Sequence, residues 1–118
     1  MAFFWIFLGG GLGSMCRYQI ARWSDHSQLF PLGTFIANAL SCLILGWLVA
    51  IHLRTELHAS HRLLLMTGFC GGFSTFSTFS METFQLLQSG HWGIALLNVL
   101  GSLLVGLICI YLGMKIAA

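Results

Sequence analysis

Four apolar segments, each about as long as the hydrocarbon core of a bilayer is thick, make up most of this chain. A membrane-spanning helix needs about 20 residues, because each residue advances the helix by about 1.5 Å. The segments that meet this length are residues 2–23, 33–53, 62–87 and 92–114. Short polar connectors separate them. The sequence therefore predicts an all-α integral membrane protein with four transmembrane helices, in a single domain over residues 1–118.

The composition favours lipid as the surroundings of these segments. Hydrophobic residues make up 58% of the chain and charged residues 7%, against about 25% charged residues in a soluble domain. A soluble protein of 118 residues cannot bury so much apolar surface. Residues 1–8 have no basic start and no small-residue cleavage site follows, so we expect a membrane helix rather than a cleaved signal peptide. The net charge of +2, without a basic run, does not suggest nucleic acid as a partner.

The charged residues give only a weak orientation signal. With four spans both termini share one side of the membrane, and that side holds Arg54, Arg62 and Lys115, whereas the other holds Arg22. The bias favours cytoplasmic termini by only about two residues. A protein that inserts in both orientations would show so small a bias, and so would a small protein with few charges. We expect a multi-pass protein of the inner (cytoplasmic) cell membrane.

The third segment carries residues that a plain membrane helix does not need. Gly71-Gly72 lies near its middle, and paired glycines weaken a helix. Either the helix is broken at this pair, or the glycines let helices pack closely. Five hydroxyl side chains follow within seven residues, more than back-bonding within a helix requires: Ser74, Thr75, Ser77, Thr78 and Ser80. This crowding favours a third helix broken at Gly71-Gly72, with freed backbone groups facing an ion.

Beyond the glycines, helical spacing gathers a polar and aromatic stripe. Thr75, Thr78, Phe79 and Glu82 share a face by i, i+3, i+4 spacing, and Phe76 lies three residues before Phe79. A charged glutamate at the centre of a span costs about 2.5–3.5 kcal/mol. Glu82 is therefore either a functional group or a protonated or paired carboxyl near the interface.

Single polar residues occur in the other spans. Asn38 offers an interhelical hydrogen bond or a functional amide, Asn98 and Ser102 share a face four residues apart, and Arg17 either snorkels to an interface or caps carbonyl groups. The sequence contains no nucleophile–base pair, phosphate loop or cofactor motif. We therefore do not expect an enzyme.

Three stretches of the sequence resemble motifs of the CrcB/Fluc family of fluoride channels. Residues 9–18, GGGLGSMCRY, resemble its GGxxGxxxR start, and residues 31–38, PLGTFIAN, resemble its PxGTxxxN segment. Residues 68–82, GFCGGFSTFSTFSME, resemble its GxCGGxTTFSTFSxE core. The three motifs occur in the family's order and cover three of the four predicted helices. The resemblance implies a fluoride-selective channel that exports fluoride passively and relieves fluoride toxicity.

The resemblance also implies an assembly and a site. By resemblance to this family, we expect a dual-topology homodimer with two antiparallel subunits and two pores between them. A sodium ion at the dimer centre would be held by the backbone carbonyl groups of Gly71 and Ser74, and Arg17 would be structural. The implied pore and fluoride-binding residues are Asn38, Thr75, Phe76, Thr78, Phe79, Glu82 and Ser102. Two positions depart from the family: Ser74 stands for a threonine, and Asn98 for a tyrosine of the fourth helix.

Two other functions are compatible with four short spans. A small proton-coupled multidrug exporter has a similar size, but its coupling glutamate lies in the first helix, where this chain has no acidic residue. A non-transporting assembly subunit would explain the small residues but not the stripe of hydroxyl groups and phenylalanines. We therefore favour the channel and keep the exporter as the alternative.

Overall fold

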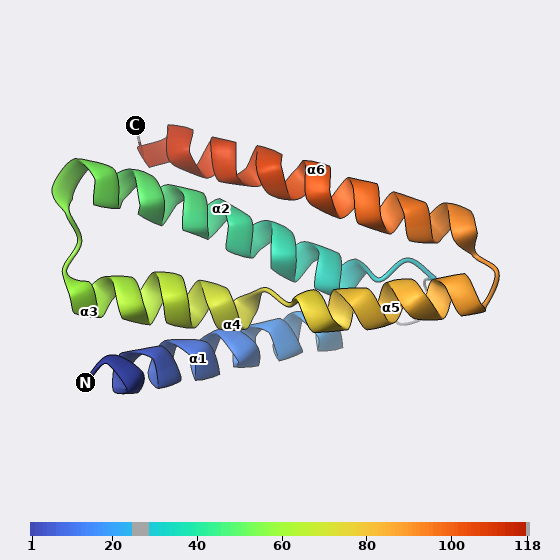
Figure 1. Ribbon diagram of the computed structural model, residues 1–118, viewed down its shortest axis with the longest axis horizontal. Helices are drawn as coiled ribbons and strands as arrows, with labels where there is room; N and C mark the ends of the chain where they lie inside the picture. Colours follow the sequence, from blue (N-terminus) through green and yellow to red (C-terminus); the bar gives the residue numbers. More distant parts are fainter. Residues whose placement is uncertain (25–28, 118) are drawn as a thin grey trace.

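The computed structural model describes residues 1–24 and 29–117, and all regular structure in these ranges is helical. The helices are α1 (Ala2–Trp23), α2 (Leu32–Thr55), α3 (Ala59–His61), η1 (Arg62–Cys70), α4 (Gly71–Phe73), α5 (Phe76–Gln88) and α6 (Trp92–Ala117). Figure 1 shows α3, η1, α4 and α5 following one another as one composite rod, which we call the third rod. The four predicted segments correspond to α1, α2, the third rod and α6. Part of the first connector, residues 25–28, lies outside the described residues.

Two of the described helices, α2 and α6, are long and apolar enough to cross a membrane. Their most apolar stretches have mean hydropathies of 2.1 and 2.4. Only 11% of that stretch of α6 is buried, so this helix presents its apolar side chains outward along most of its length. Helix α1 has 22 residues, a length of about 33 Å at about 1.5 Å per residue. The whole molecule measures 48 × 29 × 20 Å, so its long dimension exceeds the bilayer core of about 30 Å.

Close backbone contacts hold the rods together in two pairs. Helix α2 packs along α6, and α1 packs along η1 and α4. A Cβ atom at Gly46 of α2 would overlap the carbonyl group of Ile110 on α6. A Cβ atom at Gly13 of α1 would likewise overlap the carbonyl group of Phe69 on the third rod. Small residues therefore set the distance between helices in both pairs, as is common in membrane bundles.

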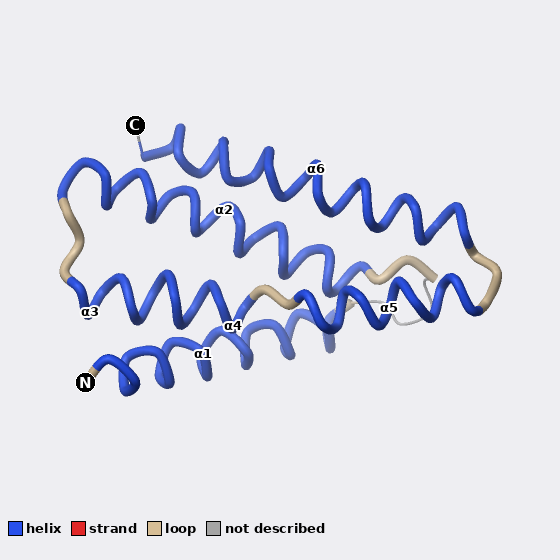
Figure 2. The backbone as a smooth tube through the Cα atoms, viewed as in Figure 1, coloured by secondary structure: helices blue, strands red, loops and turns tan. Residues whose placement is uncertain are grey.

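The third rod is interrupted, but not at the glycine pair that the sequence predicted. Gly71 and Gly72 are helical within α4, whereas Ser74 and Thr75 are extended, with ψ angles of 156° and 121°. We call Ser74 and Thr75 the helix break; it is the tan segment between α4 and α5 in Figure 2. A Cβ at Gly72 would overlap the carbonyl group of Gly10, so this glycine serves close packing. The break lies later because Thr75 is a good N-cap residue and begins a new helix.

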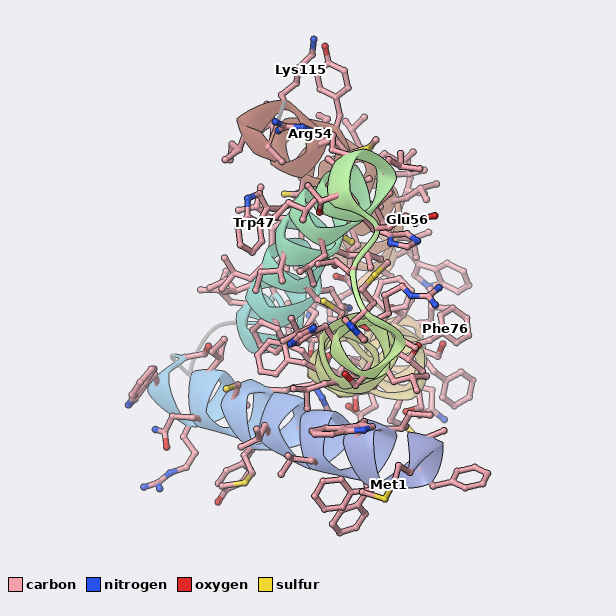
Figure 3. The ribbon with its side chains drawn as sticks, turned by 90° about the vertical axis from the view of Figure 1, so that its left-hand side faces the viewer. Met1, Trp47, Arg54, Glu56, Phe76 and Lys115 are labelled. Carbon is pink, nitrogen blue, oxygen red and sulfur yellow. The ribbon has the colours of Figure 1, made fainter. Side chains whose placement is uncertain are left out.

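Both termini lie at the same end of the bundle, beside the connection from α2 to α3 (Figure 1). This placement agrees with an even number of rods. Figure 3 views that end and labels Met1, Arg54, Glu56 and Lys115 on it. The guanidinium group of Arg54 donates a hydrogen bond to the carbonyl group of Ala117, which ties the end of α2 to the end of α6.

Candidate functional site

The helix break is held by a side-chain amide from the neighbouring helix α2. Asn38 Oδ1 accepts a hydrogen bond from the Thr75 N–H at 2.8 Å, and Asn38 Nδ2 donates one to the Thr75 carbonyl at 3.3 Å. One amide thus pairs with both backbone polar groups of an extended residue. The interhelical hydrogen bond that the sequence left open for Asn38 is therefore present, and its partner is the backbone of the break.

Two further side chains bind carbonyl groups just before the break. Ser41 Oγ on α2 donates to the Cys70 carbonyl at 2.9 Å, and Arg17 Nε on α1 donates to the Gly72 carbonyl at 3.1 Å. Of the two options that the sequence gave for Arg17, the structure shows carbonyl capping. Ser41 lies one turn after Asn38 but is not among the predicted site residues, because a lone serine in a membrane helix ordinarily bonds its own backbone.

Around the break, the carbonyl groups of Gly71, Phe73 and Ser74 have no donor among the described residues. The Thr75 N–H, which would bond to the Gly71 carbonyl in a continuous helix, donates to Asn38 instead. The hydrogen bonds of residues 1–24 and 29–117 assign no donor to the Gly71 or Ser74 carbonyl oxygens. Gly71 is exposed, and a Cβ added there would meet no atom within 4 Å. Such free carbonyl oxygens are hard ligands that fit a hard cation such as sodium, although those of Gly71 and Ser74 alone are fewer than a hard cation takes.

The start of α5 brings together the predicted hydroxyl groups and phenylalanines. Thr75 Oγ1 caps the helix by accepting from the Thr78 N–H at 3.2 Å, and it lies 3.3 Å from Ser77 Oγ. The rings of Phe76 and Phe79 lie side by side, with centroids 6.1 Å apart and planes tilted by 38°. Phe76 is 79% exposed in the single chain and points away from the bundle (Figure 3). An aromatic ring this exposed beside a polar break needs lipid or another protein surface to cover it.

Glu82 lies farther along α5, on a cavity of about 320 Å³ that the end of α1 and the start of α2 also line. Thr34 and Gln85 face the same cavity. Glu82 Oε1 is buried and has no hydrogen-bond partner among the described residues. The structure thus brings Thr75 and Thr78 together at the break and places Glu82 at a separate cavity.

A separate polar contact, away from the break, joins α5 to α6. Asn98 is 1% exposed, and its Nδ2 donates to Thr83 Oγ1 at 3.0 Å. Ser102 Oγ donates to Asn98 Oδ1 at 3.3 Å, so the predicted shared face of Asn98 and Ser102 is confirmed. The sequence did not single out Thr83, whose only signal was a hydroxyl group next to Glu82; its own proton goes to the Phe79 carbonyl at 2.8 Å.

Comparison with known proteins identifies the family to which this arrangement belongs. A family model described as CrcB-like protein, Camphor Resistance (CrcB), matches residues 4–114. A relative from Oceanobacillus iheyensis named Fluoride-specific ion channel FluC is 42% identical over 113 residues, which cover 95% of this chain and 88% of the relative. Relatives of the same name from Pyrococcus abyssi and Phocaeicola vulgatus are also 42% identical, over 95% and 92% of this chain and 92% and 91% of their own lengths. The chain therefore belongs to the CrcB-like protein family.

Proposed function

We propose that this chain is one subunit of a fluoride channel, which lets fluoride leave the cell passively and so relieves fluoride toxicity. The observation that carries the proposal is the 42% identity, along nearly the whole chain, to relatives named Fluoride-specific ion channel FluC. The multidrug exporter that the sequence left as an alternative receives no support from these relatives. The relatives are named as ion channels, a class without catalysis, and the polar groups of the site suit binding and passage of an ion.

The proposed pathway runs past the helix break toward the cavity at Glu82, and apart from this carboxyl it is formed by neutral groups. Asn38 has a second Nδ2 proton besides the one donated to Thr75, and Thr78 adds a hydroxyl group one turn along α5. Phe76 and Phe79 offer ring edges, which carry partial positive charge. The remaining proposed members of the pathway are Thr75, Glu82 and Ser102. Weak donors replace the hydration of a small anion without trapping it, as conduction requires.

We place a second copy of the chain, antiparallel to the first, against the break in an inner-membrane homodimer. Phe76 is 79% exposed and a Cβ at Gly71 would meet no atom, so one chain leaves the proposed pathway open beside the break. The weak charge bias between the two ends of the bundle suits a protein that inserts in both orientations. The apolar outer face of α6 then faces lipid or the partner.

A sodium ion between the two copies is proposed to bind the Gly71 and Ser74 carbonyl oxygens. These oxygens have no donor among the described residues, and a second copy would double their number. The ion would neutralise the carbonyl dipoles that the break releases, and it would lie between the pores rather than in either. Its role is therefore structural.

The test of the function is a paired efflux measurement from liposomes that contain the purified protein and are loaded with fluoride or chloride. We expect rapid fluoride release when a potassium ionophore balances the charge, and little chloride release. A proton gradient should have no effect on the rate, because passive conduction is not coupled to protons. Comparable release of the two anions, or no release of fluoride, would overturn the proposal.

A further inference from the structure

The Cys70 carbonyl oxygen, one turn before the helix break, receives three donors. The N–H and the hydroxyl group of Ser74 reach it at 3.0 and 2.9 Å, and Ser41 Oγ reaches it from α2 at 2.9 Å. Both Cys70 and Ser41 are 3% exposed. A single buried oxygen therefore ties Ser74 to the neighbouring helix.

Ser41 and Asn38 bind the third rod at two points, one before Gly71 and one after Ser74 in the sequence. They lie three residues apart on α2, on one face of that helix. Asn38 binds Thr75, which follows the two proposed ligand carbonyls, whereas Ser41 binds Cys70, which precedes them. The segment between these anchors contains Gly71 and Ser74. The orientation of the Cys70 carbonyl fixes the peptide plane that enters Gly71, and its hydrogen bonds fix Ser74.

We propose that Ser41 is a positioning residue for the cation site, acting through the Cys70 carbonyl oxygen to hold the Gly71 and Ser74 carbonyls in the binding geometry. This inference rests on the proposed function, because it requires the sodium site at the break. Ser41 itself does not contact the ion. Its hydroxyl group joins α2 to the cation-binding segment, so that segment need not be ordered anew when the ion binds.

Removing the hydroxyl group should loosen the site without unfolding the chain. A carbonyl oxygen has two lone pairs, and in a Ser41→Ala variant the Cys70 carbonyl keeps both donors from Ser74. No buried acceptor is left unpaired, so the large penalty of an unsatisfied group does not arise. What is lost is the link to α2, and the expected consequence is weaker sodium binding.

The experiment measures the melting temperature of the purified full chain in detergent against sodium concentration, with choline replacing sodium at constant ionic strength. A ligand that binds only the folded state raises stability by RT ln(1 + [L]/Kd), so the curve yields an apparent Kd. We expect Ser41→Ala to raise this Kd by roughly threefold to tenfold, the worth of one hydrogen bond. The matched control is Ser89→Ala, which removes a hydroxyl group that bonds its own helix, at the Gln85 carbonyl; its sodium Kd should equal that of the parent.

The outcomes separate this inference from the proposed function. If the parent responds to sodium and Ser41→Ala responds with the same Kd, Ser41 has no positioning role. If the parent shows no response to sodium, the cation site is wrong and the role of Ser41 is wrong with it, whereas the efflux test of fluoride conduction is unaffected. Should Ser41→Ala give no folded protein, Ser41→Cys retains a weak donor and takes its place. A sodium Kd of Ser41→Cys at or below that of the parent would then overturn the inference.

Discussion

Asn38 determines the conformation of the break because its amide matches a backbone residue in shape. The side chain offers an acceptor and a donor in one plane, and Thr75 presents its N–H and carbonyl groups to both. In a membrane these two backbone groups would otherwise be unsatisfied, at a cost of several kcal/mol each. A single residue of α2 therefore satisfies the backbone groups that the interruption of the third rod would leave without partners.

Replacing Asn38 by aspartate is expected to abolish most fluoride conduction. The carboxylate still accepts from the Thr75 N–H but faces the Thr75 carbonyl with negative charge, and it repels an approaching anion. We expect fluoride efflux from liposomes to fall by at least tenfold, a change of about 1.4 kcal/mol in the barrier.

The control for this charge is Gln88→Glu, which makes the same amide-to-acid change at an exposed site near the end of α5. Its efflux should match that of the parent. Parent-like conduction by the Asn38→Asp variant would place the pathway elsewhere.

What the sequence predicts well at this scale is which polar residues are unusual, and what it cannot predict is their partners. Asn38, Arg17 and Ser102 stand out as polar groups in apolar runs, and all three form hydrogen bonds to other side chains or helices. Ser41 and Thr83 are equally important to the network but are chemically ordinary. Their significance arises only when folding brings a distant carbonyl or amide within reach.

The third rod illustrates how an element can be predicted correctly and its interruption misplaced. The sequence predicts the break at the glycine pair, because paired glycines weaken a helix. In the structure Gly72 is helical, and its lack of a side chain lets the backbone of α1 pack closely against it. The interruption follows where Thr75 supplies an N-cap and Asn38 supplies a substitute for the lost backbone partner. The π-helical hydrogen bonding of η1 was not predicted either, since π-helices are rare.

At the interface of α2 and α6, a Gly46→Ala substitution is expected to destabilise the protein by about 1–3 kcal/mol, the usual range for overpacking. The added methyl group would overlap the Ile110 carbonyl, and backbone atoms cannot move aside as a flexible side chain can. The measurement is unfolding of the purified protein in detergent, followed by loss of helical signal.

Gly93→Ala provides the matched control on α6, because a Cβ there meets no atom within 4 Å. Alanine favours a helix over glycine by up to about 1 kcal/mol, so this variant should be as stable as the parent or slightly more so. Equal stability of the two variants would show that the close contact at Gly46 does not control packing.

The single chain exposes groups beside the break and along α6 that other residues of the chain do not cover. Phe76 and Gly71 are exposed, and only 11% of the most apolar stretch of α6 is buried. Length and hydropathy predict the four rods from the sequence, but they do not indicate which face of the bundle meets lipid and which meets protein. That distinction depends on how the rods turn against one another, which close glycine contacts decide.

Dual insertion predicts that a tag at the C-terminus will be accessible from both faces of the membrane. Protease protection in intact spheroplasts and in inverted vesicles should each report about half of the molecules, because the charge bias between the two ends is about two residues. Adding three lysines to the terminus should shift the population toward one orientation, with the tag in the cytoplasm. A single orientation in the unmodified protein would contradict the antiparallel dimer.

The shared location of the two termini limits how such a pair can be encoded as one polypeptide (Figure 1). In a tandem gene fusion, the C-terminus of the first copy and the N-terminus of the second emerge on the same face when the copies are parallel. A short hydrophilic linker therefore enforces the parallel arrangement. An antiparallel pair needs its linker to cross the bilayer once more, which takes about 20 apolar residues. A covalent version of the proposed antiparallel pair would thus require an additional helix between its two halves, which would invert the second copy rather than transport an ion.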